Sequence, residues 1–165
     1  MELDSQGTKE AYMQLLVDSL KRKAEILEQL KKSTKQQESI ISSDPFNEDQ
    51  FLLTINEKDG QIQLLNKLDD GFDRLYQSVK EELSAHKEKY ATQIVALKEL
   101  IVSITDAGVE LQAMEKRNKA KLEVIFSNKK RDIKNSKISS QTAASYYKNM
   151  ANQNTSQSFF YDEKN

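Results

Sequence analysis

Few of the residue types that perform catalysis or bind metals are present in this chain. Its 165 residues include no cysteine and a single histidine, His86. The sequence has no glycine-rich phosphate loop and no zinc-binding histidine motif, and no pair of carboxylates stands out from the other charges. Since thiolates and clustered imidazoles are absent, we expect no enzyme activity, no metal site and no cofactor.

The composition instead favours a helical protein of the cytoplasm. Charged residues make up 31% of the chain, yet it has only 4 glycines and 1 proline, too few for a turn-rich sheet fold. The formal net charge of −1 gives no reason to expect nucleic-acid binding. No apolar run reaches the roughly 18 residues of a membrane span, and the polar N-terminus lacks a secretory signal. We therefore expect a cytoplasmic protein without membrane insertion.

Three segments have the apolar periodicity of helices that pack along a seam. They span residues 8–42, 47–84 and 90–134. The seam residues are, in chain order, Tyr12, Leu16, Leu20, Leu27, Leu30, Thr34, Gln37 and Ile41; Phe51, Ile55, Ile62, Leu65, Leu68, Phe72, Leu75, Val79 and Leu83; and Tyr90, Ile94, Leu97, Ile101, Ile104, Gly108, Leu111, Glu115, Asn118, Leu122 and Ile125. This pattern predicts an all-α fold over residues 1–134: an elongated antiparallel three-helix bundle, coiled-coil-like and up-down-up.

The only proline, Pro45, marks the first reversal of the chain. Two helix caps are possible at this point. Asp44 could cap a helix that begins with Pro45, or Asn47 could cap one that begins at Glu48. Both alternatives predict a tight turn.

The second reversal contains neither glycine nor proline. An unbroken helix from residue 47 to 128 would be about 120 Å long, too long for the rest of the chain to cover. We place the break between residues 84 and 90 because this is the most polar stretch. His86 is expected to lie exposed in this turn.

Polar residues interrupt the seams, at Thr34 and Gln37 in the first helix and at Glu115 and Asn118 in the third. Polar seam positions weaken packing while they restrict register. We therefore expect the C-terminal end of the first helix to be loosely packed and partly hydrated. Gly108, on the third seam, is expected to allow close contact between helices.

The charges are unevenly distributed among the three segments. The middle of the first helix and the far end of the third are basic, whereas the first two-thirds of the second helix are acidic. Folding about the two turns places residues 21–35 opposite 55–69 and residues 112–126 opposite 47–61. We therefore expect basic flanks to face the acidic second helix from both sides. Such pairs contribute only about 0–1 kcal/mol each, so they mainly select orientation.

The tail, residues 135–165, differs from the rest of the chain. About half of its residues are Ser, Thr, Asn or Gln, too polar to form a core of their own. Ile138, Thr142, Tyr146 and Met150 nevertheless recur every four residues. We expect a flexible or partly helical tail that can form a short amphipathic helix on a partner.

Nearly the whole chain resembles the bacterial flagellar export chaperones of the FlgN type. The resemblance rests on loose helical patterns rather than on a catalytic signature. These patterns are Leu15-Leu16 and Ile26-Leu27-Glu28-Gln29-Leu30, Glu57-Lys58, Ile101-Val102-Ser103-Ile104, Glu115-Lys116-Arg117-Asn118-Lys119, Ala143-Ala144-Ser145-Tyr146-Tyr147-Lys148-Asn149-Met150 and Phe159-Phe160-Tyr161.

The resemblance implies a non-enzymatic cytoplasmic chaperone, a monomer or weak dimer. It would bind the C-terminal helices of flagellar hook-associated proteins, which form the hook–filament junction, and deliver them to the export gate. In the family, the end of the third helix and the tail contact the client. The corresponding residues are Leu122, Ile125, Phe126, Ile133, Ile138, Tyr146, Tyr147 and Met150.

Three alternatives remain open at this point. The related chaperone of the flagellar filament cap protein has a similar helical build, so the client could be that protein. The seams could instead serve a structural coiled-coil module that acts by self-association. The basic run Lys129-Lys130-Arg131 could contact nucleic acid, although without interleaved aromatic residues such a run is more often a solvated face.

Overall fold

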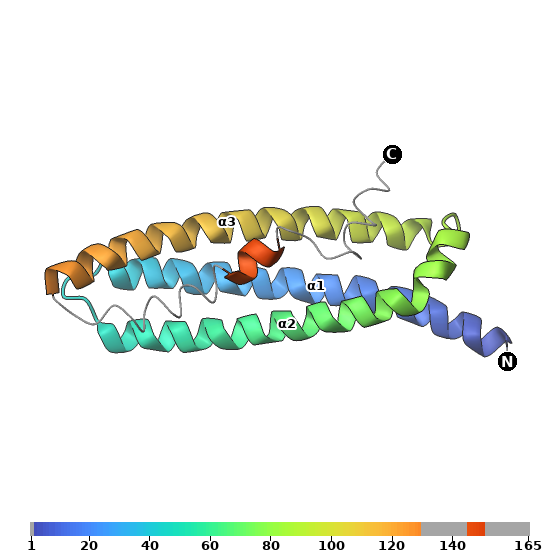
Figure 1. Ribbon diagram of the computed structural model, residues 1–165, viewed down its shortest axis with the longest axis horizontal. Helices are drawn as coiled ribbons and strands as arrows, with labels where there is room; N and C mark the ends of the chain where they lie inside the picture. The colour runs from blue at the N-terminus through green and yellow to red at the C-terminus, as the bar shows by residue number, and fades with distance from the viewer. Residues whose placement is uncertain (1, 130–144, 151–165) are drawn as a thin grey trace.

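The protein is an elongated bundle of three long helices (Figure 1). The computed structural model describes residues 2–129 and 145–150, with the side chains of residues 2–6, 128 and 129 left aside. Helix α1 spans Glu2–Ile41, α2 spans Glu48–Ala85 and α3 spans Ala91–Lys129. Successive helices run in opposite directions (Figure 1), and the described residues contain no strand. The prediction of an all-α, antiparallel three-helix bundle is confirmed.

The helix bounds differ from the expected ones mainly at the N-terminus. Helix α1 begins at Glu2, six residues before the expected start, whereas α2 and α3 begin within one residue of theirs. The expected continuation of the third helix from residue 130 to 134 lies outside the described residues. So do all of the tail residues except 145–150, which form a short helix.

The first turn is closed by the second of the two expected caps. The Oδ1 atom of Asn47 accepts a hydrogen bond from the backbone N–H of Gln50 at 3.1 Å. This bond satisfies one of the free N–H groups at the start of α2. Glu48 and Asp49 in the first turn also suit the positive end of the helix dipole.

The second turn lies between Ala85 and Ala91, as its polarity indicated. The His86 backbone N–H donates to the carbonyl of Glu82 at 3.0 Å and ends α2, and the His86 side chain is exposed. Tyr90 is buried, and its hydroxyl donates to the Glu82 carboxylate at 3.1 Å. The buried, hydrogen-bonded Tyr90 therefore fixes the second turn, which contains neither glycine nor proline.

Helix α1 is the central helix of the bundle. Both α2 and α3 pack along it, while the backbones of α2 and α3 stay apart over most of their length (Figure 1). The main core includes Leu16, Leu20, Leu27, Leu30, Leu65, Leu97 and Leu111, each at most 1% exposed. A second apolar cluster at the first turn contains Ile40, Ile41, Phe51, Ile55, Leu122 and Phe126. Burying each such side chain contributes roughly 1.5–3 kcal/mol.

The expected charge pairing holds for α1 but not for α3. Lys23 of α1 pairs with Asp69 of α2, with 2.7 Å between Nζ and Oδ1. From α3, however, Glu110 pairs with Lys31 at 2.9 Å and Lys121 with Glu38 at 3.2 Å, both across to α1. The expectation that the third helix would face α2 with its basic flank is corrected here, because α1 rather than α2 lies between the other two helices.

Candidate functional site

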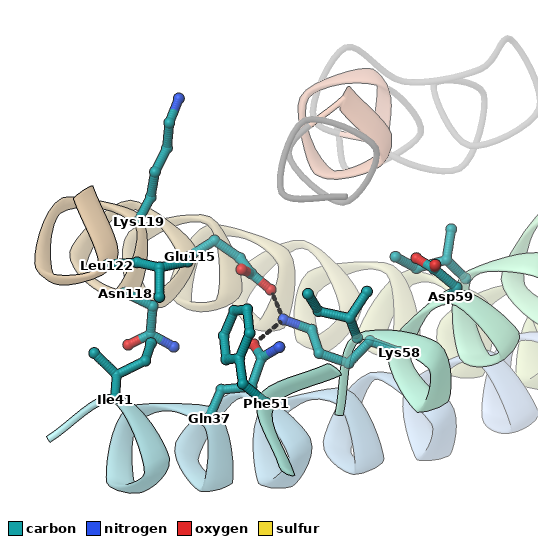
Figure 2. A pocket seen from close by; sticks show the side chains of 11 residues that line it. Gln37, Ile41, Phe51, Lys58, Asp59, Glu115, Asn118, Lys119 and Leu122 are labelled. Atoms are coloured by element: carbon teal, nitrogen blue, oxygen red, sulfur yellow. Dashed lines mark hydrogen bonds and ion pairs between the residues drawn. The ribbon is translucent and has the colours of Figure 1, made fainter. Parts of the chain in front are cut away.

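The backbones of α2 and α3 stay apart, and the side chains that fill the space between them over α1 belong to a polar cluster and to residues 145–150. We call this region the α2–α3 groove. We distinguish two parts of it: a buried polar cluster near the first turn (Figure 2), and farther along the site occupied by residues 145–150 (Figure 1). None of the described helices contains a stretch long and apolar enough to cross a membrane.

The polar cluster is centred on Lys58 of α2. Its ammonium group donates to Gln37 Oε1 at 2.8 Å and forms an ion pair with the Glu115 carboxylate of α3 (Figure 2). Lys58 is 4% exposed and Glu115 is 8% exposed. Burial lowers the pKa of Lys58 from its ordinary value, and the neighbouring Glu115 carboxylate partly opposes this shift. The cluster therefore links all three helices through one cation.

The backbone beside this cluster is also hydrogen-bonded. Asn118 Nδ2 donates to the carbonyl of Thr34 at 3.1 Å, and the Thr34 hydroxyl donates to the carbonyl of Leu30 at 2.7 Å. The exposed fractions of Thr34 and Gln37 are 0% and 4%. The expectation of a loose, partly hydrated end of the first helix is therefore wrong. The Gln37 side chain accepts from Lys58 of α2, and the Thr34 hydroxyl bonds within α1 while Asn118 of α3 donates to the Thr34 carbonyl, so both polar side chains are buried and hydrogen-bonded.

A small pocket of about 20 Å³ opens beside the polar cluster (Figure 2). Apolar side chains of Ile41, Phe51, Ile55 and Leu122 complete its lining. A volume of this size is sufficient for one water molecule. The pocket is too small for a metabolite, and the described residues contain no group of three or more side chains that could hold a metal ion.

Residues 145–150 form a short helix that lies over α1 between α2 and α3 (Figure 1). Tyr146 and Tyr147 belong to the main apolar core, with exposed fractions of 8% and 1%. The Tyr146 hydroxyl donates to Asp69 Oδ2 at 2.9 Å, while Asp69 Oδ1 accepts from Lys23. Burial, followed by the negative charge of Asp69, raises the pKa of Tyr146.

Tyr147 and Met150 of this helix also lie in the groove, Tyr147 with an unpaired hydroxyl among the described residues and Met150 in close contact with Gly108. The Tyr147 hydroxyl is buried and has no hydrogen-bond partner among the described residues, and burial together with Glu115 raises its pKa. Met150 places its methyl group where a Cβ on Gly108 would be. The expected close contact at Gly108 therefore exists, but it is made by this methionine rather than by another long helix. An open pocket of about 210 Å³ remains beside Tyr146 and Met150.

The structure separates the expected client-binding residues into two groups. Tyr146, Tyr147 and Met150 lie together in the groove. Leu122 and Phe126 are buried in the second apolar cluster, with Ile125 packed against it. Ile133 and Ile138 lie outside the described residues.

Sequence reasoning assigned no partners to four charged residues that shape the groove, although it placed Glu115 on the third seam. Lys23, Lys58, Asp69 and Glu115 come from all three helices, and they provide the ion pairs on which the tyrosines rest. Lys23, Lys58 and Glu115 occupy positions in the apolar repeats of their helices, which was the available signal: a charge on a buried seam requires a partner. Asp69 lies beside the repeat of α2, next to Leu68.

Comparison with protein-family models, curated proteins and solved structures finds no significant match to this chain.

Proposed function

We propose that the protein is a chaperone or adaptor that binds an amphipathic helix of a partner protein in the α2–α3 groove. The observation that carries this proposal is the position of residues 145–150, whose two tyrosines are almost fully buried there. A groove that buries one short amphipathic helix has the shape and the apolar surface that another such helix requires.

The resemblance to FlgN-type chaperones supports a finer form of the proposal. The partners would be the C-terminal helices of flagellar hook-associated proteins, and the protein would act in the cytoplasm before their export. Amphipathic terminal helices of this kind would otherwise associate early, and a groove that covers their apolar faces prevents this. The filament cap protein is the alternative partner.

In this mechanism the partner helix takes the place of residues 145–150. The fit of these residues leaves room for exchange, because the Tyr147 hydroxyl has no hydrogen-bond partner among the described residues and an open pocket adjoins Met150. An unsatisfied buried hydroxyl costs about 1–3 kcal/mol. Competition from the chain's own helix lowers the apparent affinity by the fraction of molecules whose groove is free. Moderate affinity suits a chaperone that must release its client.

Filling the hollow at Gly108 tests the proposal. In the Gly108→Leu variant the new side chain would occupy the space of the Met150 methyl group. Overfilling a packed site typically costs about 1–3 kcal/mol, but the substitution also weakens docking of the chain's own Met150. In a Tyr146→Ala/Tyr147→Ala background, where residues 145–150 no longer compete for the groove, the affinity for a partner helix should fall about tenfold. Val109→Leu is the matched control, because Val109 lies next to it on α3 and is 59% exposed.

Isothermal titration calorimetry with synthetic C-terminal helices of hook-associated proteins and of the cap protein measures this effect. Circular dichroism shows whether each variant keeps its helices. If neither peptide binds the full-length protein, neither flagellar protein is the client. If Gly108→Leu binds both as tightly as Val109→Leu does in the same background, the groove is not the binding site. The peptide that binds more tightly identifies the client.

A further inference from the structure

The outer face of α2 bears a row of six residues, of which only Glu57 makes a side-chain hydrogen bond to another helix among the described residues, accepting it from Ser33 of α1. Leu53 and Leu64 are 68% and 45% exposed on this face. Gly60 and Gly71 alternate with them, and Glu57 and Lys67 complete the row at successive spacings of three and four residues. Because three and four residues make one helical turn, all six lie along one side of the helix. We call this row the α2 outer stripe.

The two glycines have no structural reason within the described bundle. A Cβ at Gly60 or at Gly71 would meet no atom within 4 Å, and α2 continues through both positions. Glycine is the poorest helix former after proline, so it weakens the helix at both sites. Glycine on an exposed helix face does permit another backbone to approach closely. The open space at these positions therefore fits a contact with a second helix.

The stripe on one α2 helix is complementary in shape to the same stripe on a second α2 helix that runs antiparallel to it. An antiparallel copy of α2 centred on Ile62 places Leu53 opposite Gly71, and Gly60 opposite Leu64, with each pair occurring twice. A leucine then packs into each glycine hollow.

The same alignment brings Glu57 opposite Lys67 on both sides of the centre. The described residues show no ion pair for Lys67, while Glu57 accepts one hydrogen bond from Ser33 at 3.3 Å. Shape and charge thus agree on one arrangement, and a twofold axis repeats every contact.

We propose that the α2 outer stripe is a self-association surface through which two copies of the chain pair by antiparallel α2–α2 contact. The stripe lies on the side of α2 opposite the buried Lys58, Ile62 and Leu65, so pairing leaves the α2–α3 groove accessible. In Figure 1, α2 runs along one edge of the bundle, where a second copy can approach. From Leu53 to Gly71 the stripe is about 27 Å long, which is short for a protein interface, and the dimer is weak and reversible.

Sedimentation equilibrium of the full chain, from micromolar concentrations to about 1 mM, tests the proposal. The expected result is a reversible monomer–dimer equilibrium. Replacing both Gly60 and Gly71 by leucine fills the hollows and should weaken pairing at least about tenfold. The same variant should melt no lower than the natural chain, because leucine is the better helix former and both positions face open space. Gly7→Leu on α1, where the space around the glycine is also open, is the matched control.

A charge exchange tests the alignment itself. Glu57→Lys alone and Lys67→Glu alone each place like charges opposite one another and should weaken pairing. An equimolar mixture of these two variants should form a heterodimer, because every opposed pair is again of opposite sign. The proposal is overturned if the natural chain stays monomeric up to about 1 mM. Unchanged affinity in the double leucine variant, or a mixture that associates no better than its components, also overturns it.

Discussion

The same substitution at two adjacent tyrosines should change the stability of the tail helix in opposite directions. Tyr146→Phe removes a hydroxyl that donates to Asp69 at 2.9 Å. Tyr147→Phe removes a hydroxyl that is buried without a partner among the described residues. The rings stay in both variants, so the apolar burial changes little. The sign of each effect depends only on whether the hydroxyl is hydrogen-bonded.

The magnitudes follow from these two environments. A hydrogen bond to a charged group contributes about 1.5–3 kcal/mol, but Asp69 keeps Lys23 at 2.7 Å after the change. We expect Tyr146→Phe to weaken docking of residues 145–150 by about 1–2 kcal/mol, a factor of about 5–30. Burying an unsatisfied hydroxyl costs about 1–3 kcal/mol, so Tyr147→Phe should strengthen docking by about 1 kcal/mol, or about fivefold.

Hydrogen exchange of the backbone amides of residues 145–150 reports on this docking directly. Exchange should become faster in Tyr146→Phe and slower in Tyr147→Phe, while Tyr12→Phe, on the half-buried side of α1, should leave it unchanged. If a partner helix displaces these residues, its affinity should rise in the first variant and fall in the second. Shifts of the same sign in both variants, or none, would refute the assignment of these two hydroxyl environments.

Two further predictions concern titratable groups in the core. Lys58→Met or Glu115→Leu alone should lower the free energy of unfolding in urea by about 3–5 kcal/mol, because each leaves one buried charge unpaired. The double variant should change this free energy little. Equal losses in the single and double variants would contradict the prediction. Raised tyrosine pKa values favour the neutral phenol in the folded state, so stability should be intact below about pH 10, the ordinary tyrosine pKa, and fall above it as the unfolded chain loses protons. Absorbance near 295 nm should then show that four of the six tyrosines ionise only together with the loss of helical circular dichroism. Ionisation of more than two tyrosines with the helices intact would count against it. The groups concerned are Tyr76, Tyr90, Tyr146 and Tyr147.

Much of the fold could be predicted from local pattern. The seam spacing identified three helices, and a proline with an adjacent Asn cap located the first turn. These features depend on residues close in sequence, whose chemistry is readable without the rest of the chain. The error at Thr34 and Gln37 has the opposite cause. Lys58, which bonds the Gln37 side chain, and Asn118, which bonds the Thr34 carbonyl, are distant in sequence, so a buried and hydrogen-bonded polar seam has the same sequence pattern as a hydrated one.

The candidate site shows the same division. A four-residue spacing singled out Tyr146 and Met150 as anchors of a short amphipathic helix, and residues 145–150 are helical. Their positions against Asp69 and Gly108 could not be predicted, because these contacts join segments separated by the length of an entire helix.

By itself, the sequence determined the helical class, the number and direction of the long helices and the absence of cysteine and histidine clusters, because periodicity and composition are local properties. Only the tertiary structure decided which helix lies in the centre. The pattern allowed α2 to be flanked by the other two, yet α1 takes that place and leaves the α2–α3 groove. The physical reason is that each helix has one apolar seam, and the local pattern does not say how three seams pack together. That arrangement depends on contacts between residues far apart in sequence, among them the Lys58–Glu115 pair and the two buried tyrosines.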